Sequence, residues 1–189
     1  MKIGIFVGHS RKGDQGAVSI GSVSEFVFNL AVAENLRSEL TARGIASEVV
    51  HWYGGNSYGA AMSWVGKKCR EAGFTAAIEL HFNAASAPQA NGHEFLFYNG
   101  SQKGCHLAAA LAESFQHHFP FSRPRAEGGL LRRTAADRGS LFLRKTPCPA
   151  VILEPFFGSN SEEWDYFSAN KKLLAISYAD ALAAWCRAQ

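Results

Sequence analysis

The sequence predicts an α/β fold, a three-layer sandwich with a twisted, mostly parallel sheet of about six strands flanked by helices. Short apolar runs alternate along the chain with longer segments whose apolar residues recur at helical spacing. The runs are apolar throughout, which is typical of strands that helices cover on both faces. The length of 189 residues suits one domain, which we expect to span residues 1–189.

Each expected element has a local reason. The first strand, residues 2–7, is a β-branched run ending at Gly8, and the helix over 24–43 stops before Gly44. Residues 119–138 are rich in arginine and proline, lack periodicity and are expected to be irregular. The remaining expected strands are 46–52, 76–80, 94–98, 141–143 and 150–153, and the remaining helices are 58–71, 103–118, 162–167 and 171–187.

Composition excludes several classes of protein. The chain has 19 basic and 16 acidic residues, and a net charge of +3 is too small for a typical nucleic-acid binder. No apolar window is long enough to span a membrane, and the N-terminal residues do not form a signal peptide. We therefore expect synthesis in the cytoplasm. The four cysteines form no C-x-x-C pair and are expected to be reduced thiols.

Polar residues stand where three of the expected strands end. His9 follows the first strand, His81 and Asn83 follow the strand over 76–80, and Glu154 follows the strand over 150–153. Ligands of open α/β sheets bind outside the carboxyl ends of the strands, so these side chains should meet at one edge. Glu25, at the start of the first helix, can reach the same edge.

Two histidines and a carboxylate are a common zinc set in hydrolases, and zinc lowers the pKa of its water to about 7. A further carboxylate can then take the proton and return it to a leaving amine. Each residue also has a simpler interpretation. Ser22 and Glu25 fit a helix capping box, Glu154 could be an ion-pair partner, and either histidine could be a polar loop residue.

Four ordered motifs, spread over residues 3–185, resemble zinc-dependent N-acetylmuramoyl-L-alanine amidases of the amidase 3 type. They are Gly8-His9 followed by Gly-Asp-Gln-Gly-Ala at 13–17, Glu25 with Asn-Leu-Ala at 29–31, Leu-His-Phe-Asn-Ala at 80–84, and Pro-Ala-Val-Ile-Leu-Glu at 149–154 with Phe-Gly-Ser-Asn at 157–160. Gly92 and Glu94 also fall where this family has a Gly-x-Glu strand.

The resemblance implies that His9, Glu25 and His81 bind Zn²⁺ and that Glu154 is the general base and acid. The implied substrate is peptidoglycan, cut at the amide between N-acetylmuramic acid and L-alanine of the stem peptide. Asn83 is a candidate for orienting a ligand or the substrate.

Two features depart from the family pattern. The loop after His9 is one residue longer than the family's, and Glu79 stands where the family often has a small residue. Strand alternation places Glu79 on the side of His81, where it could fix a histidine tautomer or be a buried ion-pair partner.

Arginines gather between residues 123 and 144 and could meet stem-peptide carboxylates, or could simply be solvated. Arg138 and Arg144 are the preferred candidates because they lie nearest the strand that leads to Glu154. Regulated members of the family carry an inserted helix that blocks zinc. The prolines and glycines of this segment disfavour such a helix, so we expect an open site.

Other functions remain open at this level. A zinc amidohydrolase or carboxypeptidase acting on a small amide, similar to formylglutamate hydrolases, would use the same residues. An inactive wall-binding module would lack a ligand or a base, and neither is missing. The expected context is lysin-like: a monomer that reaches the cell wall or periplasm after release, as a phage endolysin does in cytolysis. A prophage remnant or a secreted effector would also fit.

Overall fold

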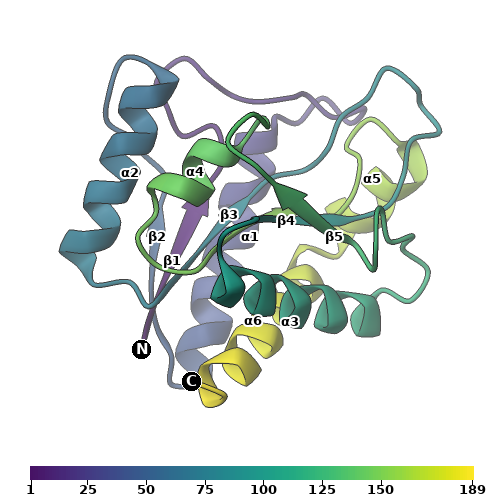
Figure 1. Cartoon of the computed structure of the whole chain (residues 1–189). Coiled ribbons are helices and arrows are strands. Elements are labelled where there is room, and N and C mark those ends of the chain that lie inside the picture. The colour runs from purple at the N-terminus through teal and green to yellow at the C-terminus, as the bar shows by residue number, and fades with distance from the viewer.

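The computed structural model describes residues 1–189 and confirms the predicted α/β class, with a six-stranded sheet between helices (Figure 1). The elements are, in chain order, β1 (Lys2–Val7), α1 (Glu25–Ala42), β2 (Ala46–Val50), α2 (Tyr58–Ala72), β3 (Ala76–Leu80), β4 (Glu94–Tyr98), α3 (Gln102–His118), β5 (Leu130–Arg133), α4 (Ser140–Lys145), β6 (Ala150–Glu154), α5 (Ser161–Ala169) and α6 (Lys171–Arg187).

The sheet order β2-β1-β3-β6-β4-β5 explains where the site forms. The first four strands in this order run parallel, so the carboxyl ends of β1, β3 and β6 lie side by side. β4 pairs with β6 in the antiparallel direction, with Glu94 opposite Glu154, and β5 runs parallel to β4. The amino-terminal ends of β4 and β5 therefore meet the carboxyl ends of the other strands.

The core has two parts, one on each face of the sheet. Alternate residues of β1 show this division, because Ile5 belongs to the larger cluster with α1, α3, α5 and α6, whereas Phe6 packs with α2 and α4. Figure 1 shows α2 and α4 on one side of the strands and α1, α3 and α6 on the other. No helix combines the length and apolarity that crossing a membrane requires.

Two sequence-based expectations need correction. Residues 141–143 are not a strand but lie in helix α4, which starts after Gly139 at φ 78° and buries Phe142 and Leu143 against α2. Helical spacing of only six residues is too short to show in the sequence. The sixth strand is instead β5, within the segment expected to be irregular. None of its four residues is fully buried and two of them are arginines, so they form no apolar run that would indicate a strand.

Candidate metal and catalytic site

The three predicted ligands converge at the sheet edge. The donor atoms of His9, Glu25 and His81 lie within 4.8 Å of one another. His9 Nε2 is 3.2 Å from Glu25 Oε2, and His81 Nδ1 is 2.7 Å from Glu25 Oε1. Two imidazoles and one carboxylate around a common point are a donor set that suits Zn²⁺ with an open fourth position. The residues present therefore fit the metal that the sequence implied.

Glu25 does not cap helix α1. The cap is Ser24, whose hydroxyl accepts a hydrogen bond from the Val27 amide. The Glu25 carboxylate, 4 % exposed, instead accepts from the amides of Ala17 and Phe82. The capping-box interpretation of Ser22 and Glu25 is therefore wrong, and α1 serves to hold this carboxylate between the two histidines.

The backbone around the group is constrained. His9 has φ 60°, a left-handed conformation that is uncommon for a side-chain-bearing residue and marks local strain. Gly16, at φ 71°, approaches so closely that a Cβ there would lie 2.6 Å from His9 Cδ2. A Cβ at Gly8 would lie 2.3 Å from Cε1 of His81. Both glycines allow the main chain to press against the imidazole rings.

Charge is concentrated in this group. Burial opposes ionisation of all three side chains, but their mutual hydrogen bonds and charges outweigh it. The pKa of Glu25 falls well below its usual range because of the two histidines. The pKa of His81 is raised well above its usual value by Glu25 and Glu79, and that of His9 is raised by Glu25 and Asp14. Without a metal, the carboxylates are thus balanced by protons on the histidines, and a bound cation would replace those protons.

Glu154 ends β6 directly beside this group. The pairing of β6 with β3 places it there, because the amide of His81, just after β3, donates to the carbonyl of Leu153, the residue before Glu154. Its Oε2 is buried and has no hydrogen-bond partner, so the ion-pair interpretation finds no support. Burial, with the nearby charges of Glu25 and Glu94, raises the pKa of Glu154 to about 8, against the opposing effect of the histidines. A carboxyl group in this state is able to hold and release a proton near neutral pH.

A second polar group adjoins Glu154. Asn83 Nδ2 donates to Glu94 Oε1 at 3.3 Å, and Arg125 Nε donates to Glu94 Oε2 at 3.1 Å. The Arg125 guanidinium also lies over the Phe157 ring, 4.9 Å from its centroid. Asn83 thus lies near the site as expected. Nothing in the sequence distinguished Arg125 from the other arginines of its segment, because its place depends on the reversed direction of β4.

The two preferred arginines, Arg138 and Arg144, lie in different places relative to the site. Arg138 is exposed and lies near Tyr58. Burial and the charge of Glu79 raise the pKa of Tyr58 to about 12, and the charge of Arg138 opposes this rise. Arg138 is thus on the side of the sheet where Glu79 lies. Arg144 lines a hollow with Pro149, which precedes β6, whereas Glu154 ends that strand. The structure therefore does not bring Arg144 to the predicted metal ligands.

Each histidine also has a carboxylate oxygen beside its other ring nitrogen. Asp14 Oδ1 is 2.9 Å from His9 Nδ1, and Glu79 Oε2 is 3.3 Å from His81 Nε2. Asp14 lies in the first motif, but its role was not predicted from the sequence. Glu79 does lie on the side of His81, as strand alternation predicted. The structure also adds Tyr53, whose hydroxyl donates to Glu79 Oε1 at 2.9 Å.

Part of the site faces solvent, and two hollows lie elsewhere. The His9 side chain is 27 % exposed. The two helices that flank the arginine-rich segment in the chain, α3 and α4, pack against α6 and α2.

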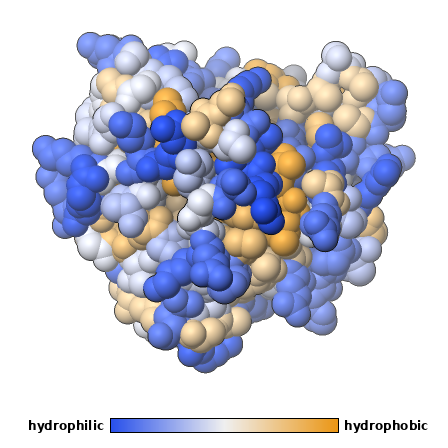
Figure 2. All heavy atoms as spheres, viewed as in Figure 1, coloured by the Kyte–Doolittle hydropathy of each residue, from blue (hydrophilic) through white to orange (hydrophobic).

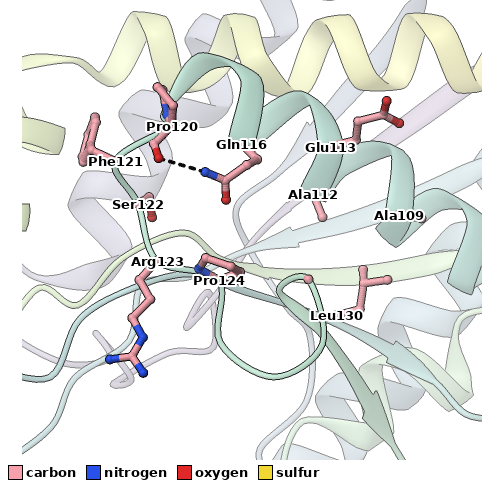
Figure 3. Close-up of a pocket in the computed structure, with 11 residues that line it drawn as sticks. Ala109, Ala112, Glu113, Gln116, Pro120, Phe121, Ser122, Arg123, Pro124 and Leu130 are labelled. Carbon is pink, nitrogen blue, oxygen red and sulfur yellow. Dashed lines mark hydrogen bonds between the residues drawn. The ribbon is translucent and has the colours of Figure 1, made fainter.

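A cavity of about 660 Å³ lies between α3 and residues 120–124, away from the predicted ligands, with Gln116 donating to the Pro120 carbonyl (Figure 3). The face seen in Figure 2 is mostly hydrophilic, with apolar residues in separate patches.

A His-Glu-His group beside a buried glutamate, at the carboxyl ends of a parallel sheet, is typical of hydrolase domains, and comparison with known proteins makes the class specific. The family model of N-acetylmuramoyl-L-alanine amidases of the amidase 3 type matches residues 3–184. This chain belongs to that family. A search of curated protein sequences finds no match.

Solved structures share the fold. The CwlD amidase from Clostridioides difficile, solved in complex with the GerS lipoprotein, has a TM-score of 0.85 at 17% identity, covering 100% of this chain and 99% of that chain. The catalytic domain of CwlV, from Bacillus (Paenibacillus) polymyxa var. colistinus, has a TM-score of 0.78 at 21% identity, covering 100% of both chains. The catalytic domain of the CD27L endolysin, which targets Clostridia difficile, has a TM-score of 0.77 at 24% identity, covering 96% of both.

Proposed function

We propose that this chain is a zinc-dependent peptidoglycan amidase that hydrolyses the amide between N-acetylmuramic acid and the L-alanine of the stem peptide. The convergence of His9, Glu25 and His81 beside Glu154, in a chain of this family, is the observation that supports it most strongly. The family favours this substrate over a small amide, although the same side chains could serve either reaction.

The proposed roles follow from the geometry. His9 Nε2, His81 and Glu25 would hold Zn²⁺, and the open position would face the substrate. When bound, zinc supplies a lowered pKa for water and polarises the amide carbonyl. Glu154 takes the proton of the attacking water on its unpartnered Oε2 and delivers it to the leaving amine as the C–N bond breaks and the C–O bond forms. A cation nearby lowers the pKa of Glu154 and so favours the carboxylate that this step needs.

Substrate contacts are proposed for the surrounding polar side chains. Asn83, held by Glu94, is positioned to orient a substrate amide next to Glu154. Arg138, exposed on the side where Glu79 lies, is available to pair with a stem-peptide carboxylate. Arg144 is the weakest of these candidates because of its place before β6.

The test is a single preparation measured in two ways. Bound zinc is quantified by elemental analysis, and purified peptidoglycan is digested and its products are identified by mass. We expect free stem peptides with an L-alanine amino terminus. Products cut elsewhere, or turnover of small N-acyl amino acids without wall cleavage, would favour the small-amide function instead.

Two variants test the roles of the residues. Glu154→Gln should retain zinc and lose about 10²- to 10⁴-fold in activity, the usual contribution of a general acid-base group. His81→Ala should lose zinc. Glu162→Gln, an exposed glutamate on α5, is the matched control and should change neither. Full activity in Glu154→Gln, or full zinc content in His81→Ala, would overturn the corresponding assignment.

We further propose that the chain acts as a lysin, made in the cytoplasm and delivered to the wall as a monomer. The likeness to the catalytic domain of an endolysin supports this context. Expression in bacteria with and without a pore-forming holin tests it, since lysis should require the holin. Lysis without one would contradict release through a membrane lesion.

A further inference from the structure

The buried pair Tyr53–Glu79 is the most unusual feature beside the proposed metal site. Glu79 lies in the central strand β3 and is only 5 % exposed. A carboxylate buried to this extent is costly unless hydrogen bonds or charges compensate. Glu79 finds two such partners, the Tyr53 hydroxyl at 2.9 Å and His81 Nε2 at 3.3 Å, one for each carboxylate oxygen.

Tyr53 is itself fixed from several directions. It is 3 % exposed, and its amide donates to the Ser10 carbonyl in the loop that carries His9. Its ring packs against Phe6 and stacks with Trp64, with centroid separations of 6.1 and 6.3 Å. The phenol therefore has little freedom, and its hydroxyl points at Glu79 from a rigid support.

The His81 ring is held in one orientation by the same surroundings. One edge, Nε2, faces Glu79, and the opposite nitrogen, Nδ1, is 2.7 Å from Glu25. The ring lies against the backbone at Gly8, where a Cβ would be 2.3 Å from Cε1. A ring flip would move Nδ1 away from Glu25 and break both contacts.

We propose that Tyr53 and Glu79 form a tether that keeps the proton of His81 on Nε2 and so presents the Nδ1 lone pair to the metal. The inference rests on the proposed metal centre and deepens it. Tyr53 and Glu79 are positioning residues, because they act through His81. Hydrogen-bonded carboxylates of this kind orient metal-binding histidines and increase their basicity.

The direct test identifies the bound nitrogen. The full chain, labelled with ¹⁵N-histidine, is loaded with ¹¹³Cd²⁺, and cadmium–nitrogen couplings are measured by NMR. We expect coupling to His81 Nδ1 and a protonated, uncoupled Nε2. Coupling to Nε2 of His81, or no binding of cadmium, would overturn the proposal. The readout needs no variant and no catalytic activity.

Variants then test the tether. Glu79→Gln keeps the size of the side chain and removes its charge, and zinc affinity measured by chelator competition should fall by about 10- to 100-fold. Tyr53→Phe should weaken zinc binding less than Glu79→Gln does. It should have no further effect in the Glu79→Gln background, because Tyr53 acts only through Glu79. Glu71→Gln, an exposed glutamate of α2, is the control.

Outcomes for the tether and for the proposed function are separable. Additive effects of the two substitutions, or unchanged affinity in Glu79→Gln, would contradict the tether even if the chain cleaves peptidoglycan. Nδ1 coupling in a chain that does not cleave peptidoglycan would refute the amidase function and leave the tether intact. Near-ultraviolet circular dichroism of each variant shows whether a loss of affinity reflects loss of folding.

Discussion

Acid should destabilise this protein partly through one residue, His93, which is not one of the candidate metal ligands. The side chain is 0 % exposed, and its ring packs 4.6 Å from the centroid of Phe115. Nδ1 is 3.0 Å from the Ser122 hydroxyl, and Nε2 has no partner. Burial lowers the pKa of His93 from 6.5 to about 4, because a charged imidazole would lose its hydration there.

The sign and size of the effect follow from proton binding. The unfolded chain takes up a proton on this residue near pH 6.5 and the folded chain only near pH 4. Between these values the unfolded state binds more protons, so stability is lost as pH falls through this range. At 1.36 kcal/mol per pKa unit, the His93 contribution to the free energy of unfolding should fall by about 2 kcal/mol between pH 7 and pH 5.

Urea unfolding followed by tryptophan fluorescence measures the effect on the metal-free chain at pH 7 and pH 5. His93→Phe keeps an aromatic ring and cannot titrate, so its loss of stability between the two pH values should be smaller than that of the parent by about 2 kcal/mol. His93→Asn provides a second variant, and His51→Asn, at an exposed position, the control. An equal loss in the parent and in both His93 variants would refute the reasoning.

Three further outcomes are expected. Gly16→Ala and Gly13→Ala should each lower the free energy of unfolding by about 1 kcal/mol, because both place an alanine in the left-handed region. Only Gly16→Ala also places a Cβ against His9, so only this variant should weaken zinc binding in a chelator titration. Equal zinc affinities would contradict the close approach. Ser24→Ala should lower the free energy of unfolding by about 1 kcal/mol through loss of the α1 cap, and an unchanged urea midpoint would count against that cap. Chelation should abolish wall digestion and added Zn²⁺ restore it, and digestion that survives dialysis against a chelator would exclude the metal.

Much of the site was visible in the sequence because its residues directly follow strands. His9, His81 and Glu154 each come within two residues of a strand end, and a parallel sheet gathers such ends whatever the order of its strands. Glu25 was more ambiguous, since a glutamate at a helix start is equally a capping residue. Only the hydrogen bonds to Ala17 and Phe82 decide between the two.

The remainder depends on which strands are neighbours, and periodicity carries no such information. Tyr53, which follows β2, reaches Glu79 of β3 across the end of β1, because β1 lies between those two strands. Arg125 reaches Glu94 because β4 is reversed. Arg144 seemed close to the site because it precedes β6 in the chain, but the whole length of that strand separates it from Glu154.

The reversal of β4 has a consequence for how this fold can diversify. The segments over 84–93 and 119–129 lead into the reversed strands and thus lie at the sheet edge that carries the candidate site, whereas in an all-parallel sheet they would lie at the opposite end. Both are connections outside the regular elements, where insertions are tolerated well. Evolution, or an engineer, can therefore lengthen either one and reshape the surroundings of the candidate site without altering the proposed metal ligands.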